Sequence, residues 1–176
     1  MMEFVCNANF KGQYHKSINL RKLHEHVPNS KLHMTPYQLV IKDLKGTLIF
    51  FSTGRFRIMG CIDELEASFL PFAYLQKLEK HPLTKFPAVT VQSYTLKYNL
   101  GFYIHLLKMS DALMIAEVPF ACDFELFPAI RLKEFKPVSV NVFNTGKVMI
   151  CGLRNPDDIY SIIPRLKELC EPYKMV

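Results

Sequence analysis

The feature that most constrains this chain is an internal duplication. Residues 50–61 read FFSTGRFRIMGC, and residues 142–153 read VFNTGKVMICGL. Aligning the two segments matches these pairs, each separated by 92 residues: Phe51/Phe143, Thr53/Thr145, Gly54/Gly146, Arg55/Lys147 and Gly60/Gly152. So many matches in so short a segment exceed chance, and we expect the chain to fold as two copies of one unit.

Each copy is predicted to be a β-hairpin with one buried and one exposed face. Glycine in the sequences STG and NTG supplies the positive φ that a short hairpin turn needs. Before the second turn, valines at 138, 140 and 142 alternate with Ser139, Asn141 and Phe143. After the first turn, Phe56 and Ile58 alternate with cationic residues. The exposed face of each hairpin should therefore carry a Phe and a basic residue, unlike an ordinary half-solvated sheet.

The remaining segments repeat the same plan. Residues 4–11 and 91–97 are predicted strands, and residues 19–26 and 105–113 are predicted short helices. A long helix is predicted after each hairpin. Asp63 and Glu64 open the first, and Asn155 is a cap for the second, followed by a proline and acidic residues. Pro71 and Pro164 predict a kink or a late start in these helices, and HPLTKFP (81–87) predicts a connector. The expected repeats are residues 1–84 and 85–176 of one continuous α+β domain, with the helices on one face of the sheet.

Composition narrows the possible functions. A net charge of +6 and a pI near 9.0 favour a polyanionic partner through counterion release, or simply a basic solvated surface. The cysteines are dispersed, which predicts reduced thiols, and His24 and His26 lack a matching ligand pair, so neither a metal nor a cofactor is expected. The N-terminus has no apolar run typical of a secretory signal, and no segment approaches a membrane span. Pairs such as Cys61 with His33 have no supporting catalytic motif, so we do not expect an enzyme.

Several segments resemble the TATA-box-binding protein family. FELFPAIRLKEFKP (124–137), VFNTGKVMICG (142–152) and DIYSIIPRLKEL (158–169) resemble its second repeat, and TLIFFSTGR (47–55) resembles its first. GFYIHLL (101–107) resembles the stretch that precedes the second stirrup, the loop at the end of the family's sheet. The resemblance covers nearly the whole chain at low identity. It implies an α+β saddle, in which two pseudo-symmetric repeats form a curved antiparallel sheet with helices on the convex face.

The resemblance also implies a DNA site on the concave face, which in this family lies in the minor groove of double-stranded DNA. Wedging side chains enter base steps and kink the duplex. The positions that match the wedges are Phe51, Phe127 followed by Pro128, Phe143 and, by the family spacing, Met34. The positions that match the asparagines at the centre of the groove are Asn7 and Ser93. The positions that match phosphate-binding residues are Arg55, Lys133, Lys147 and Arg154.

The chain departs from the family where the groove lining should be apolar. Arg57, Asn9 and Asn141 stand at such positions. Arginine is attracted by the negative potential of a minor groove, so we expect general affinity for AT-rich minor grooves rather than strict TATA recognition.

The resemblance implies protein partners as well. Asp123-Phe124-Glu125-Leu126 matches the acidic stirrup with which the family binds transcription factor IIB, so a factor-IIB-like protein or an RNA polymerase subunit is expected. An alternative is an interaction module or decoy that resembles the TATA-box-binding protein (TBP) and no longer bends DNA. Exposed apolar side chains on the concave face favour a homodimer in the absence of DNA. The divergence and the lack of a long N-terminal tail predict a viral or fast-evolving relative, acting in the nucleus, the host nucleus or a viral replication site.

Overall fold

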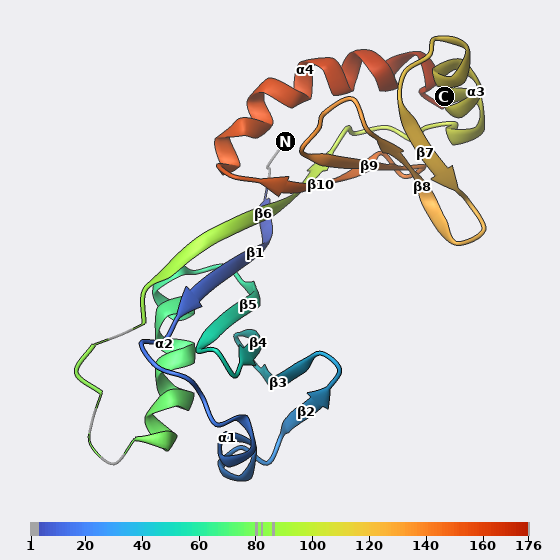
Figure 1. Ribbon diagram of the computed structural model, residues 1–176. Helices are drawn as coiled ribbons and strands as arrows, with labels where there is room; N and C mark the ends of the chain where they lie inside the picture. Colours follow the sequence, from blue (N-terminus) through green and yellow to red (C-terminus); the bar gives the residue numbers. More distant parts are fainter. Residues whose placement is uncertain (1–3, 80, 82, 86, 176) are drawn as a thin grey trace. The chain divides into compact units, whose positions relative to one another are not determined.

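The computed structural model describes residues 4–79, 81, 83–85 and 87–175. Contacts divide the chain into two compact units (Figure 1). One is Asn7–Gln92, which we call the first half, and the other, the second half, joins the residues up to Cys6 to those from Ser93 onward. Residues 82 and 86 of the predicted connector lie outside the described residues. The repeat boundaries 1–84 and 85–176 remain a prediction.

The first half is an antiparallel sheet with helices against one face. Its elements are β1 (Phe4–Gln13), α1 (Leu20–His26), β2 (Ser30–Met34), β3 (Tyr37–Asp43), β4 (Gly46–Phe51), β5 (Arg55–Cys61), α2 (Glu64–Leu75) and the 3₁₀ turn η1 (Gln76–Leu78). The strands are ordered β2-β3-β4-β5-β1. Strand β1 begins in the second half, where the Cys6 thiol donates to the Thr95 carbonyl at 3.4 Å.

The second half repeats this plan. Its elements are β6 (Val89–Asn99), α3 (Leu106–Ile115), β7 (Phe120–Asp123), β8 (Phe127–Leu132), β9 (Ser139–Phe143), β10 (Lys147–Leu153), η2 (Pro156–Asp158), α4 (Ile159–Cys170) and η3 (Glu171–Tyr173). The strands are ordered β6-β10-β9-β8-β7. Read from the first strand of each half, the order β6-β10-β9-β8-β7 corresponds strand by strand to β1-β5-β4-β3-β2. The predicted duplication is therefore confirmed in the topology.

The duplication extends to single hydrogen bonds around the turns. The Tyr14 N–H donates to the Gly54 carbonyl at 2.9 Å, and the Leu100 N–H donates to the Gly146 carbonyl at the same distance. A β-bulge at Gly60 in β5 has its counterpart in β10. Equivalent residues of the two hairpins are 92 positions apart in the sequence, as Arg55 and Lys147 are. In the first strands the separation is 86, because Gln13 lies opposite Arg55 and its equivalent Asn99 lies opposite Lys147.

The predicted helix starts are also confirmed. Asp63 accepts from the N–H groups of Leu65 and Glu66 at 2.7 and 3.1 Å. The Asn155 side chain accepts from the Asp157 N–H at 3.1 Å and forms a capping box at the start of η2, from which α4 continues. Both long helices run through their prolines at 71 and 164, so the late starts that these prolines could have caused do not occur.

Alternation along the strands gives each sheet two different faces. In the hairpin of the first half, Phe50, Phe56 and Ile58 are at most 1% exposed beneath the helices. The alternating residues, such as Phe51 and Arg57, are partly or fully exposed. We call the face that the helices leave uncovered the open face of each half.

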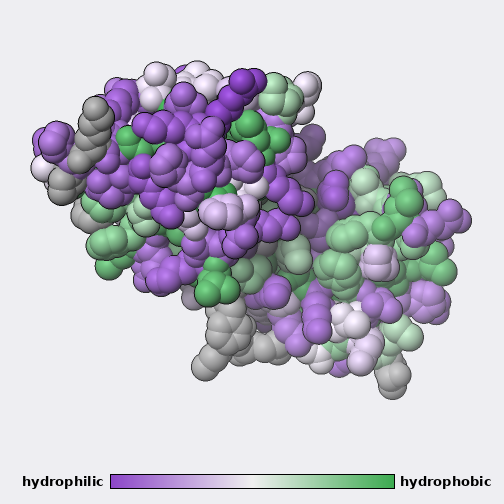
Figure 2. Space-filling view, turned by 90° about the horizontal axis from the view of Figure 1, so that it is seen from below, coloured by the Kyte–Doolittle hydropathy of each residue, from purple (hydrophilic) through white to green (hydrophobic). Residues whose placement is uncertain are grey.

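The chain is rich in apolar residues, and some of them remain on the surface. Figure 2 shows hydrophobic side chains gathered in patches between hydrophilic stretches on the side of the molecule that it presents. Most large exposed apolar residues lie on helices or in loops; they include Leu44, Ile62, Leu65, Phe69, Ile115 and Leu126.

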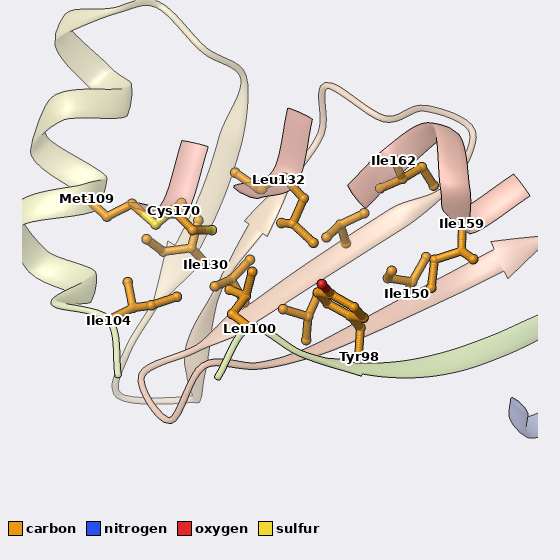
Figure 3. Packing of buried hydrophobic residues seen from close by; sticks show 14 of the residues in the cluster. Tyr98, Leu100, Ile104, Met109, Ile130, Leu132, Ile150, Ile159, Ile162 and Cys170 are labelled. Atoms are coloured by element: carbon orange, nitrogen blue, oxygen red, sulfur yellow. The ribbon is translucent and has the colours of Figure 1, made fainter. Parts of the chain in front are cut away.

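The core of the second half joins its sheet to α3 and α4 (Figure 3). Ile130 and Ile150 from the strands pack in one cluster with Met109 of α3 and Ile162 of α4. Cys170 at the end of α4 is fully buried in this cluster, and burial raises the pKa of its thiol to about 12. This cysteine therefore packs as a small apolar residue.

Replacing Gly146 by Ala should destabilise the second half strongly. Gly146 has a φ of +74°, and a Cβ there would lie 1.9 Å from the Phe102 carbonyl oxygen. Gly152 is the matched control, because its φ is +94° but its nearest neighbour would be 3.7 Å away. Urea unfolding should show a loss of about 1–2 kcal/mol for Gly152→Ala from the backbone conformation alone. We expect Gly146→Ala to cost at least about 2 kcal/mol more, and equal losses would contradict the close packing at this turn.

Candidate nucleic-acid interface

The open face of the first half concentrates positive charge. Its cationic residues are Lys11, Lys31, Lys42, Arg55 and Arg57, and no Asp or Glu from the described strands points to this face. Lys11 lies directly opposite Arg57 on neighbouring strands. In the described part of the chain neither side chain forms a salt bridge. Since facing like charges are destabilising, an anion bound between them would stabilise this arrangement.

A concave site lies at the turn end of this face. It encloses about 830 Å³ and is lined by three of the cations together with aromatic rings. The main contributors are Lys11, Tyr37, Phe51, Arg55 and Arg57. Cations beside exposed aromatic rings suit a ligand that carries both phosphates and planar bases.

The open face of the second half is organised around one hydrogen-bonded polar pair, a buried asparagine and an exposed arginine. The Arg131 Nε donates to the Asn141 Oδ1 at 3.2 Å, and Asn141 is only 6% exposed. This bond holds the guanidinium on the open face, because Arg131 and Asn141 lie directly opposite each other on β8 and β9. Sequence analysis identified Asn141 but missed Arg131; its alternation with the apolar Ile130 and Leu132 was the available signal.

The two halves carry their arginines in the same cross-strand row but at different strands. In the first half the row runs Val40, Ile49, Arg57, Lys11. In the second half it runs Arg131, Asn141, Met149, Lys97. Each row ends in a lysine on the first strand of its repeat, so each half presents one arginine and one lysine at the same level of its sheet.

The structure brings two of the predicted wedge residues together. The rings of Phe127 and Phe143 are 5.5 Å apart between centroids and meet edge to face at 71°. Phe127 is 39% exposed, so an aromatic surface remains available at the end of this open face.

Met34 does not occupy the matching place in the first half. It ends β2 opposite Tyr37 and is 63% exposed, and it is not among the residues that line the site with Phe51. Gln38 and Ala129 are equivalent, since they lie opposite Phe51 and Phe143. Phe127 is two residues before Ala129, so its equivalent is Pro36, two residues before Gln38. The family spacing missed this because the connection from β3 to β4 is shorter than that from β8 to β9. The neighbouring Tyr37 lines the site with Phe51 and was not identified from the sequence.

The predicted groove-centre residues lie at equivalent positions of β1 and β6. Asn7 and Ser93 are 86 residues apart, which is the separation that relates the first strands of the two repeats. The Asn7 Oδ1 accepts from the Gly60 N–H at 2.9 Å, which fixes the amide at the bulge and leaves its NH₂ group as a donor. Ser93 stands at the corresponding bulge of the second half and is half-buried.

The remaining predicted DNA contacts are distributed differently. Lys147 begins β10 directly after the turn, and Lys133 and Arg154 are exposed just beyond the ends of β8 and β10. Pro128 lies on the other side of the sheet, where it lines a cavity of about 350 Å³ with Leu107 and Phe124. Pro128 is therefore positioned to shape the stirrup rather than the open face.

The acidic stirrup forms the turn between β7 and β8. Asp123 accepts from the Leu126 N–H at 3.2 Å, which closes the turn. Glu125 is exposed, and Leu126 is 84% exposed. The stirrup thus presents an apolar side chain beside carboxylates on a chain of opposite net charge.

Other kinds of site have little support in the described residues. No group of three or more His, Cys, Asp or Glu among them could hold a metal ion. Burial raises the pKa of the Cys61 thiol, and Cys61 points to the covered face while His33 points to the open face. No helix in the described part of the chain is long and apolar enough to cross a membrane.

The chain is similar to TATA-box-binding proteins in sequence and in fold. The family model described as "Transcription factor TFIID (or TATA-binding protein, TBP)" matches residues 88–171. A TATA-box-binding protein of Thermococcus kodakarensis is 24% identical over 168 residues, covering 90% of this chain and 85% of the relative. The mouse TATA box-binding protein-like 2 is also 24% identical, and the chain covers 46% of its length. The solved TBP of Methanococcus jannaschii superposes with a TM-score of 0.78 at 19% identity, covering 96% of this chain and 98% of that one.

The fold and the site define a two-repeat α+β protein of the TBP type, which confirms the fold class predicted from the sequence. The second half matches the sequence pattern of the TATA-binding protein family, and the whole chain is similar to divergent members of that family. Proteins of this family and fold are transcription factors and not enzymes.

A double-mutant cycle can test the pairing on the open faces. Phe127→Ala and Phe143→Ala, singly and together, should show a coupling of about 0.5–1.5 kcal/mol in urea unfolding because the rings meet edge to face. The same cycle on Met34 and Phe51 should show no coupling, since Met34 lies opposite Tyr37 and Phe51 lies opposite Gln38, so the two side chains are not paired. A coupling for Met34 and Phe51 as large as that for the phenylalanine pair would contradict the register described above.

Proposed function

We propose that this chain is a transcription-initiation factor that binds the minor groove of promoter DNA with the open faces of its two halves and bends the duplex. The observation that carries the proposal is the set of unneutralised cations on the open face, above all Lys11 opposite Arg57, beside exposed aromatic residues. The similarity to the TATA-binding protein family supports it. The proposed place of action is where promoters are transcribed, which is the nucleus in a eukaryotic host.

The residues divide into three roles in this proposal. Arg55, Lys147 and the exposed lysines neutralise phosphates, which contributes affinity without sequence reading. Phe51 and the Phe127–Phe143 pair wedge between base steps, since apolar side chains inserted in this way kink DNA. The amide NH₂ of Asn7 donates to the acceptors that A·T and T·A share in the minor groove.

The preference is proposed to be for AT-rich minor grooves in general. Arg57 and the Arg131–Asn141 pair interrupt what would otherwise be an apolar lining. Guanidinium groups favour the strong negative potential of a narrow minor groove, whereas they do not favour one order of A·T and T·A pairs over another.

Binding to fluorescent duplexes tests the groove. Replacing A·T by I·C pairs preserves the minor-groove acceptors, whereas G·C adds the guanine amino group there. Affinity should be retained on I·C duplexes and reduced on G·C duplexes. Phe51→Ala with Phe143→Ala should weaken binding and reduce bending, measured by energy transfer between the duplex ends. Phe69→Ala is the control, because Phe69 is exposed on α2 away from the open face. Equal affinity for all three duplexes would contradict minor-groove binding.

The salt dependence tests the charge pair. The logarithm of the affinity should fall linearly with the logarithm of the salt concentration, by about 0.9 per phosphate contact. Lys11→Ala combined with Arg57→Ala should reduce this slope by about 2, since it removes two contacts. Lys167→Ala with Lys108→Ala removes the same charge from the helices and should leave the slope nearly unchanged. An equal reduction by both pairs would mean that the open face does not bind the phosphates.

We propose further that the acidic stirrup binds a transcription factor IIB-like protein. Exposed Leu126 beside Asp123 and Glu125 supports this second role, because an apolar anchor with charges around it suits a protein interface. The competing function is an interaction module or decoy that binds such a partner and no longer bends DNA. Self-association through the open faces is a third arrangement.

Pull-down with a purified factor-IIB-like protein separates these roles. Glu125→Arg should abolish recovery of the partner, while Glu25→Arg, the same charge change at an exposed site of α1, should not. Recovery that persists without DNA, together with no DNA affinity, would favour the interaction module. Recovery unaffected by Glu125→Arg would refute the stirrup as the partner site. Sedimentation of the free protein shows whether it dimerises and whether DNA dissolves the dimer.

A further inference from the structure

The outer side of α2 is apolar, which is unusual for the surface of a helix. Leu65 is 72% exposed and Phe69 is 57% exposed, and Ile62 just before the helix is 58% exposed. The opposite side of α2 is apolar as well, since Leu70 and Leu75 pack inward. A helix with apolar residues on both sides is typically covered on both sides.

The second half supplies an internal control. The helix caps of the two halves, Asp63 and Asn155, are equivalent, since they are separated by the 92 residues that relate the two hairpins. At this separation the counterparts of Ile62, Leu65 and Phe69 are Arg154, Asp157 and Ser161. The same positions of the same fold are therefore polar in one half and apolar in the other, so the fold itself does not require these apolar residues.

A groove follows this side of α2. It encloses about 540 Å³, and its walls are α2 and the turn between β3 and β4. Leu65, Phe69 and Phe72 contribute apolar surface from the helix at spacings of four and three residues. This volume is in the range of sites that enclose a ligand or several anchoring side chains.

The rim of the groove is acidic, although the chain as a whole is basic. Asp43, Asp63 and Glu66 line it together with one cation, Lys45, which forms an ion pair with Glu66. The hydrogen bond from the Tyr74 hydroxyl, 2.7 Å long, lowers the pKa of Asp43, which keeps this carboxylate charged at neutral pH. The groove therefore has an excess of negative charge around an apolar floor.

We infer that this α2 groove is a docking site for an amphipathic helix of a partner protein, with large apolar side chains on one face and Lys or Arg beside them. The spacing of Leu65, Phe69 and Phe72 follows one side of a helix over about 10 Å, which matches the ridge of a second helix packed against it. A peptide added as a strand is disfavoured, because β3 and β4 are each paired on both sides. The carboxylates at the rim repel phosphates, which disfavours DNA and anionic lipid surfaces as occupants.

The test uses the full chain and three designed peptides of equal length. The first is an amphipathic helix with Leu and Phe on one face and Lys on its flanks, the second has the same composition in scrambled order, and the third replaces Lys by Glu. Binding is measured by fluorescence anisotropy, and the contact surface is mapped by amide chemical shifts. The basic amphipathic peptide should bind at the α2 groove, and the other two should bind at least about tenfold more weakly.

The second half provides the variant that removes the site. Leu65→Asp with Phe69→Ser introduces the residues found at the equivalent positions, and should weaken binding by about tenfold or more while the melting temperature is maintained. Ile115→Asp with Leu107→Ser, at exposed apolar positions of α3, is the matched control and should leave binding unchanged. Glu66→Lys, which reverses one charge of the rim and keeps the apolar surface, should weaken binding by a smaller factor.

Three results would overturn the inference. They are equal binding of the scrambled peptide, equal losses in the α2 and α3 variants, and chemical-shift changes confined to other elements. Sedimentation provides a further outcome: a dimer of the free protein that Leu65→Asp with Phe69→Ser dissolves would identify a second copy of this chain as the occupant and would also overturn it. None of these measurements involves DNA, so the result is independent of the proposed DNA-binding function.

Discussion

The structure depends on burying one face of each five-stranded antiparallel sheet beneath its helices. In the first half this face contributes Phe50, Phe56 and Ile58, and in the second half it contributes Ile130 and Ile150, all of them essentially inaccessible. Because side chains alternate along a strand, fixing one face inward fixes the other face outward. The side chains of the open face are thus held on a rigid scaffold while taking no part in the core, and they can diverge without loss of the fold.

That freedom explains how the two halves came to differ while keeping the same hydrogen bonds around their turns. Both halves carry an arginine and a lysine in one cross-strand row, but Arg131 is held by Asn141, whereas Arg57 faces Lys11. The hydrogen bond to Asn141 satisfies Arg131 within the second half, whereas Arg57 and Lys11 leave adjacent like charges in the first half. The first half therefore has the stronger electrostatic demand for an anion, and the second half has the paired aromatic rings.

The helix-covered sides have diverged as well. Helix α4 presents polar residues where α2 presents Leu65 and Phe69, although both begin at equivalent caps. Duplicated halves with separate outer surfaces allow one molecule to contact several partners from one scaffold. The acidic stirrup belongs to the second half and the α2 groove to the first, so the two proposed protein contacts use surfaces of different repeats.

The sequence by itself determined the features that depend on near neighbours. Gly54 and Gly146 marked the turns, Asp63 and Asn155 marked the helix starts, and strict alternation around Val140 and Ile58 separated the two faces, because turn, cap and pleat are set within a few residues. Only the tertiary structure decided which residues lie opposite one another. It placed Pro36, and not Met34, at the position equivalent to Phe127, brought Arg131 to Asn141, and set Lys11 against Arg57. Register depends on loop lengths and on contacts between distant strands, and a spacing counted along the chain does not contain that information.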